Sequence, residues 1–75
     1  MYTPQLYPLK DSIGNVHHVG VVRDSCTGTY VGSICEGVSV LMLSGRYRQP
    51  VVAVGEANTP LEAAKQAMQN YNASS

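Results

Sequence analysis

The chain has 75 residues and a mass of 8.0 kDa, and its five basic and five acidic side chains give a formal net charge of zero. A chain of this length forms one domain and buries only about 60% of the surface that it exposes when unfolded, which excludes a two-domain enzyme with a cleft between its domains. The balanced charge excludes, at the level of the whole chain, the basic surface with which proteins bind nucleic acids or anionic lipids.

The composition favours a small folded protein that associates with another molecule. Hydrophobic residues make up 44% of the chain, which is ordinary for a folded domain, whereas charged residues make up only 13%, about half of the usual ~25%. So few charges provide little repulsion between molecules, and we therefore expect part of the surface to be covered in an oligomer or by a partner.

The sequence also predicts a compartment. No apolar run approaches the ~18 residues of a membrane-spanning helix, and the first residues lack the pattern of a secretory signal, so we expect no membrane. Cys26 and Cys35 are too few for a disulfide scaffold. We therefore predict two free thiols and a cytoplasmic location.

Residues 1–12 are predicted to form an extended N-terminal arm, with an edge strand as the alternative. Pro4 and Pro8 fix their own backbone dihedrals and push the preceding residues toward extended geometry. Such a segment is ordered only when it packs on something, so we expect its apolar side chains to make oligomer contacts. These side chains are Tyr2, Leu6, Tyr7 and Leu9.

Short segments rich in β-branched residues predict β-strands between turns of Gly, Ser, Asp and Asn. The predicted strands are residues 16–23, 29–35, 38–43 and 51–54. The segment 38–43 is the most apolar, so we expect it in the centre of the sheet. Residues 44–50 are interpreted as a tight hairpin that leads into Pro50, or alternatively as a polar loop.

A helix begins after Asn58. Thr59 is placed to cap it, Pro60 occupies the first helical position, and Glu62 completes a capping box. One apolar stripe then recurs at helical spacing. It consists of Leu61, Ala64, Met68 and Tyr71.

These elements predict an α+β fold of β-β-β-β-α order, in which one C-terminal helix packs on one face of an antiparallel sheet of three to four strands. The arm covers residues 1–12, the domain residues 13–72, and a frayed tail residues 73–75. A single helix leaves the other sheet face uncovered, so this face is either wet or packed against a second copy.

No constellation of residues predicts catalysis or a metal site. His17 and His18 are adjacent on a strand and point to opposite faces, so they do not chelate one ion together. A three-residue loop between the first two strands would place His17 opposite Cys35, but this Cys–His pair lacks an orienting third group. Phosphate-binding glycine loops and nucleophile motifs are absent from the sequence. We predict no enzymatic activity, no cofactor and no metal.

Two features are candidate binding sites. The same register places Gly20 opposite Gly32, which would leave a groove of exposed backbone with Tyr30 beside it. Arg46, Tyr47 and Arg48 form the one basic-aromatic cluster of the sequence, which suits a carboxylate, a phosphate or a partner surface.

The segment 51–57 (VVAVGEA) followed by 59–67 (TPLEAAKQA) resembles the last strand and the Ala-rich helix of double-stranded-RNA-binding domains, and is similar to the strand-to-helix step of HicB-type antitoxins. The resemblance covers about 20 residues and implies topology. In the RNA-binding family, lysines at the helix start contact phosphate. Here Thr59, Pro60 and Leu61 occupy that region, and Lys65 is its one basic residue.

The sequence thus favours a small non-enzymatic protein-binding module, a regulator or inhibitor that occupies a partner's surface, as phages and mobile elements often encode. The alternative is an oligomer that binds or sequesters a small anionic, nucleotide-like ligand. A weak nucleic-acid binder is third, because zero net charge releases few counterions. In each case we expect a homo-oligomer, most simply a dimer.

Overall fold

The computed structural model describes residues 5–37, 40–41 and 43–74. Four antiparallel strands form one sheet in the order β1-β2-β3-β6, and the helix α1 packs against it. Two short strands, β4 and β5, pair with each other in a separate sheet. The bounds are β1 Gln5–Lys10, β2 Val16–Arg23, β3 Tyr30–Cys35, β4 Val40–Leu41, β5 Tyr47–Arg48, β6 Val51–Ala57 and α1 Pro60–Ala73. The predicted α+β class is confirmed.

The membership of the sheet differs from the prediction at one strand. The segment 38–43, expected in the centre, contributes only Val40–Leu41 as β4, while its positions 38, 39 and 42 lie outside the described residues. The fourth strand of the main sheet is instead part of the predicted arm, because Gln5–Lys10 pairs along its whole length with β2. The β3–β6 ladder becomes irregular between Ile34 and Cys35, and the chain leaves the main sheet there to form the β4–β5 hairpin.

The predicted helix start is confirmed. Thr59 is the N-cap in an extended conformation, and its Oγ1 accepts a hydrogen bond of 3.3 Å from the backbone N–H of Glu62. Pro60 follows at the first helical position, where no intrahelical N–H is needed. Among the described residues, no helix has the length and apolar content that crossing a membrane requires.

The helix approaches the sheet closely because both surfaces are built from small residues. Gly32 of β3 lies opposite Gly55 of β6, directly beneath α1. A Cβ added to Gly32 would lie 2.7 Å from the carbonyl oxygen of Ala63, and one added to Gly55 would lie 2.6 Å from the carbonyl carbon of Gln66. The buried helix face is Ala63, Ala64, Ala67 and Met68. Leu61, predicted in the stripe, is instead 44% exposed.

The core beneath the helix is small. Val19, Val21 and Ile34 are its buried sheet residues. Tyr7 and Leu9 of the arm pack at its margin, so these two expected oligomer contacts belong to the chain's own fold. Leu6 points to the other face and is 62% exposed, and Tyr2 lies outside the described residues.

Candidate functional site

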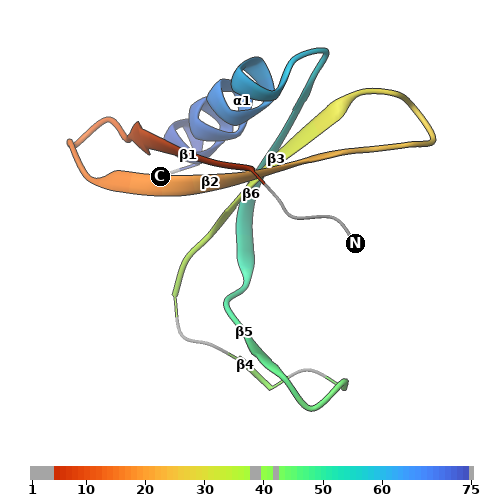
Figure 1. Ribbon diagram of the computed structural model, residues 1–75. Helices are drawn as coiled ribbons and strands as arrows, with labels where there is room; N and C mark the ends of the chain where they lie inside the picture. Colours follow the sequence, from red (N-terminus) through yellow and green to blue (C-terminus); the bar gives the residue numbers. More distant parts are fainter. Residues whose placement is uncertain (1–4, 38–39, 42, 75) are drawn as a thin grey trace.

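The first candidate is the β4–β5 hairpin, which extends beyond the sheet and away from α1 (Figure 1). Leu41 pairs with Tyr47 and Val40 with Arg48, and Gly45 turns the chain with a positive φ of 81°. The hairpin root is fixed by two hydrogen bonds, from the Gln49 amide to the Gly37 carbonyl and from the Glu36 N–H to the Pro50 carbonyl. The segment is therefore part of a hairpin, as the first of the two interpretations predicted, but five residues join Leu41 to Tyr47 in place of the tight turn expected.

The end of this hairpin carries large apolar side chains in solvent. Leu41 is 62% exposed, Tyr47 is 72% exposed and Leu43 is fully exposed. Arg46, also exposed, is the chain neighbour of Tyr47. Aromatic and arginine side chains are the ones that contribute most to binding at protein interfaces. The predicted Arg46-Tyr47-Arg48 segment thus lies on a protruding element, with leucines that the sequence analysis assigned to a central strand.

The second candidate is the sheet face opposite α1, here called the open face. It contains a shallow groove with a volume of about 570 Å³, whose lining includes Leu6, Val16, His18, Gly20 and Cys35. Several large apolar side chains of this face are about half exposed. They are Leu6, Val16, Val22, Val51 and Val54.

The predicted glycine pair is wrong by one residue. Gly20 lies opposite Ser33, and Gly32 lies opposite Val21. The turn is longer by one residue than expected, because Asp24 lies opposite Thr29 and donates its N–H to the Thr29 carbonyl, while Gly28 lies within the turn and donates its N–H to the Asp24 carbonyl. A shift of one residue moves a strand's side chains to the other face.

The shifted register separates the residues of the predicted groove. Gly20 remains on the open face, where a Cβ would meet nothing closer than 3.9 Å. Gly32 is buried under α1, and Tyr30 packs at the margin of the core on that side. Gly32 and Gly55 therefore form the close glycine pair, and the chain's own helix fills the space above them.

The predicted His17–Cys35 pair is also wrong. His17 lies on the helix side of the sheet, where its ring packs against that of Tyr71 with centroids 4.8 Å apart. Cys35 is exposed and lines the groove of the open face together with His18. The pairing that suggested a nucleophile therefore does not form.

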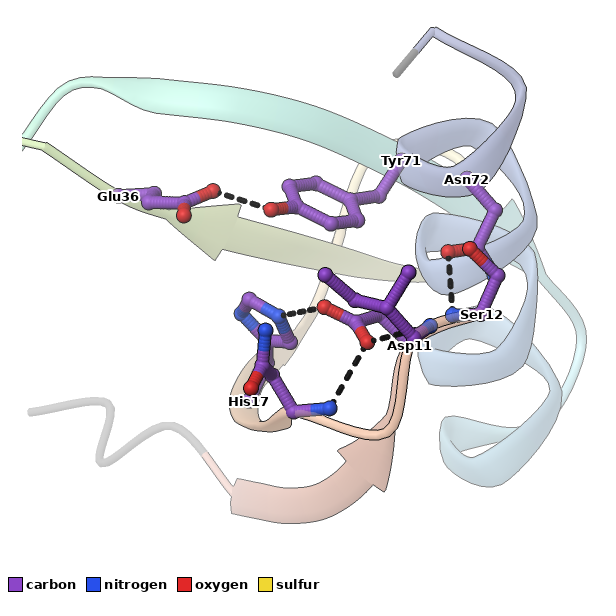
Figure 2. A network of polar contacts seen from close by, with 8 residues as sticks. Asp11, Ser12, His17, Glu36, Tyr71 and Asn72 are labelled. Atoms are coloured by element: carbon purple, nitrogen blue, oxygen red, sulfur yellow. Dashed lines mark hydrogen bonds and ion pairs between the residues drawn. The ribbon is translucent and has the colours of Figure 1, made fainter.

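A polar cluster that the sequence analysis did not predict joins the β1–β2 turn to α1 (Figure 2). The Asp11 side chain is 3% exposed, and its Oδ1 accepts hydrogen bonds from the N–H groups of Ile13 and Asn15. Its Oδ2 lies 2.8 Å from Nε2 of His17. The hydrogen bond to His17 lowers the pKa of Asp11, with the two backbone bonds acting in the same direction against the effect of burial.

Tyr71 extends this cluster to the end of β3. Its hydroxyl donates a hydrogen bond of 2.5 Å to Oε2 of Glu36, which raises the pKa of Tyr71 above its usual value of about 10. The Ser12 N–H donates to Oδ1 of Asn72 (Figure 2). We call Asp11, His17, Glu36 and Tyr71 the clasp, because they tie the first turn and the third strand to the helix.

The hydrogen bonds within the protein account for the buried polar atoms of the clasp. Asp11 has hydrogen-bond partners on both oxygens, and among the described residues no buried side-chain nitrogen or oxygen lacks a partner. No group of three or more His, Cys, Asp or Glu in this part of the chain is arranged to hold a metal ion. The arrangement of the clasp is therefore that of a structural contact between the β1–β2 turn, β3 and α1. The turn pattern Asp11 to Asn15 was a local signal for half of it, whereas the contact with Tyr71 joins residues far apart in the sequence.

Comparison of the chain with models of protein families, with curated proteins and with solved structures found no match. The candidate sites therefore rest on their own geometry. Two surfaces stand out from it, the end of the β4–β5 hairpin and the open face.

Proposed function

We propose that the protein is a non-enzymatic module that binds another protein and regulates or inhibits it by occupying its surface. The observation that carries this proposal is the β4–β5 hairpin, which holds Leu41, Leu43 and Tyr47 in solvent away from the core. Exposed apolar side chains that gather in one place are typical of interaction sites, whereas single ones are normal on any surface.

The shape of the hairpin suits insertion into a concave partner surface. Its root is fixed by the hydrogen bonds of Gln49 and Glu36, so less conformational freedom is lost when the end of the hairpin binds. Tyr47 supplies a large contact area with few rotatable bonds, and Arg46 beside it supplies charge for a carboxylate on the partner.

The test uses a photo-crosslinking amino acid placed at Leu43 in cells that produce the protein. The expected result is one crosslinked protein that is absent when the same group replaces Leu61, which is exposed on the helix. The purified partner should then bind the wild-type chain, and replacing Arg46, Tyr47 and Arg48 by Ala should weaken its affinity at least about 100-fold with little change in melting temperature. Binding that survives the triple substitution would contradict the proposal.

A second candidate function is the binding of a small anionic ligand. The observation that favours it is the groove of about 570 Å³, which is the size of small-molecule sites and presents His18, Ser33 and Gln49 as polar groups. Mass spectrometry under native conditions tests this function. A retained small molecule that a His18→Ala variant no longer carries would support it, and a ligand-free spectrum from freshly purified protein would contradict it.

We place the module in the cytoplasm. Both cysteines are free and exposed, a state that a reducing compartment preserves. An oxidising compartment would expose these thiols to intermolecular disulfide formation. A disulfide-linked form of the protein in its native cells, seen on non-reducing gels after thiol blocking, would contradict this placement.

A further inference from the structure

We propose that the open face is covered by the open face of a second copy of this chain, in a two-fold dimer in which Lys10 of each copy lies over Glu56 of the other. This dimer does not depend on the function assigned to the hairpin.

The chemistry of the face is that of an interface. Leu6, Val16, Val22 and Val54 are between 41% and 62% exposed and lie on three different strands. Gly20, Ser33 and Cys35 lie between them and carry no formal charge in the thiol form. Depletion of charge at the centre distinguishes the core of an interface from the rest of a protein surface.

The size of the face is sufficient. A standard interface buries about 800 Å² on each partner, which is about one seventh of the 5420 Å² that this chain exposes. The molecule measures 33 × 33 × 18 Å, so it is flat, and the open face lies on one of its two broad sides while α1 occupies the other. These dimensions include the β4–β5 hairpin, so a dimer of standard size would use the whole open face of the sheet.

The edges of the sheet argue for association through the face. Pro8 lies in the edge strand β1 and has no amide hydrogen to offer to a further strand, and Lys10 carries a charge at the end of the same strand. Pro50 precedes the other edge strand, β6. Edge-to-edge pairing of two copies through β1 is thus disfavoured, while the face carries no comparable obstacle.

The charges on the face are self-complementary. Among the described strand residues of the open face, Lys10 and Glu56 carry the formal charges, and both are exposed. Lys10 ends β1 and Glu56 lies near the end of β6, and these strands are antiparallel on opposite edges of the sheet, so the two residues occupy diagonal corners. A two-fold axis between the faces and perpendicular to that diagonal places each Lys10 over the partner copy's Glu56. A hydrogen bond of 2.6 Å from the Thr29 hydroxyl orients this carboxylate.

The first test is sedimentation equilibrium of the whole chain up to about 1 mM. The expected mass is twice the 8.0 kDa of one chain. Val54→Glu should raise the dimer dissociation constant at least about 100-fold, because each copy would then bury a new carboxylate against the apolar face of the other. The matched control is Leu61→Glu, a similarly exposed residue on the helix, which should leave the dissociation constant unchanged.

Leu6→Glu provides a second variant of the same kind, since Leu6 is 62% exposed on the edge strand and the circular dichroism spectrum should remain that of the wild type. A wild-type chain that stays monomeric over the whole range would overturn the proposal. Equal effects of Val54→Glu and Leu61→Glu in folded variants would overturn it as well, and would show that another surface associates.

A charge reversal tests the two-fold arrangement. Lys10→Glu and Glu56→Lys should each weaken the dimer, because each places like charges at both corners. The double variant should restore the wild-type dissociation constant to within about threefold. A double variant as weak as the single ones would overturn the pairing of the two corners.

Discussion

The close packing of α1 on the sheet makes Gly55→Ala a sharp test of the fold. An added Cβ would lie 2.6 Å from the carbonyl carbon of Gln66 and closer still to the backbone nitrogen of Ala67. Both neighbours are helix backbone, so no side-chain rotation relieves the overlap and the helix itself must move. We therefore expect the overlap to lower the free energy of unfolding by about 3 kcal/mol, the upper end of the range for overpacked sites.

Part of this cost is offset in the unfolded state. Alanine has fewer unfolded conformations than glycine, which returns roughly 0.5–1 kcal/mol. The net loss of about 2–2.5 kcal/mol corresponds to a fall of roughly 8–20 °C in melting temperature for a domain of this size. The assay is thermal unfolding followed by circular dichroism at the lowest working concentration, so that association contributes little.

Gly20→Ala is the matched control, because Gly20 is also a strand glycine but has open space above it. Its Cβ would meet only Leu6 and Ser33, each at 3.9 Å. We expect its melting temperature to stay unchanged or to rise by up to about 8 °C. If Gly55→Ala melted within about 2 °C of the wild type, the helix would not lie as close to β6 as described, and the reasoning would be refuted.

The remaining predictions concern the cap, the core, the clasp and the thiols. Thr59→Ala should lower the free energy of unfolding by about 1 kcal/mol in denaturant titrations, because the Glu62 N–H loses its acceptor. Met68→Ala should lower it by roughly 2–5 kcal/mol in the same titrations through a core cavity, and a neutral result would show that this face does not meet the sheet. The pKa of Asp11 is lowered in the folded chain, so its contribution to stability is present above the unfolded value of 3.8 and is lost as the pH falls through the folded value. The melting temperatures of the wild type and of Asp11→Asn, measured as a function of pH, should therefore converge at acid pH. Reductant should leave the melting temperature unchanged, since Cys26 and Cys35 are free, and a large fall would show a disulfide.

The elements that sequence analysis predicted correctly are those with local signals. The start of α1 depends on Thr59 and Pro60, which are neighbours in the sequence, and the strand 16–23 is dense in β-branched residues. The segment 38–43 was misplaced because its apolar composition is typical of a buried strand, whereas here Leu41 and Leu43 lie in solvent. Apolar composition predicts that a side chain tends to be buried, but it does not predict whether the chain's own core or a partner buries it.

The candidate sites were less predictable because they depend on register and on contacts distant in sequence. One extra turn residue after Asp24 moved Gly32 from the expected groove to the helix side. The partner of Gly32 is Gly55, and their pairing follows from the β3–β6 ladder on either side of a hairpin that was not expected to leave the main sheet. The clasp likewise joins Asp11 to Tyr71 through His17, and no spacing rule connects those residues.

The distribution of apolar residues between core and surface connects the fold to its association. The helix face consists largely of alanine above a pair of glycines, so the contact is close but contains few large side chains. Among the described residues, only Val19, Val21, Ile34 and Met68 are large and buried, whereas eleven large hydrophobic residues are exposed. A domain of this size with so small a core has little stability to spare. Covering the open face by a second copy would move several of those side chains out of water, and would leave the hairpin as the apolar surface that remains available to a different partner.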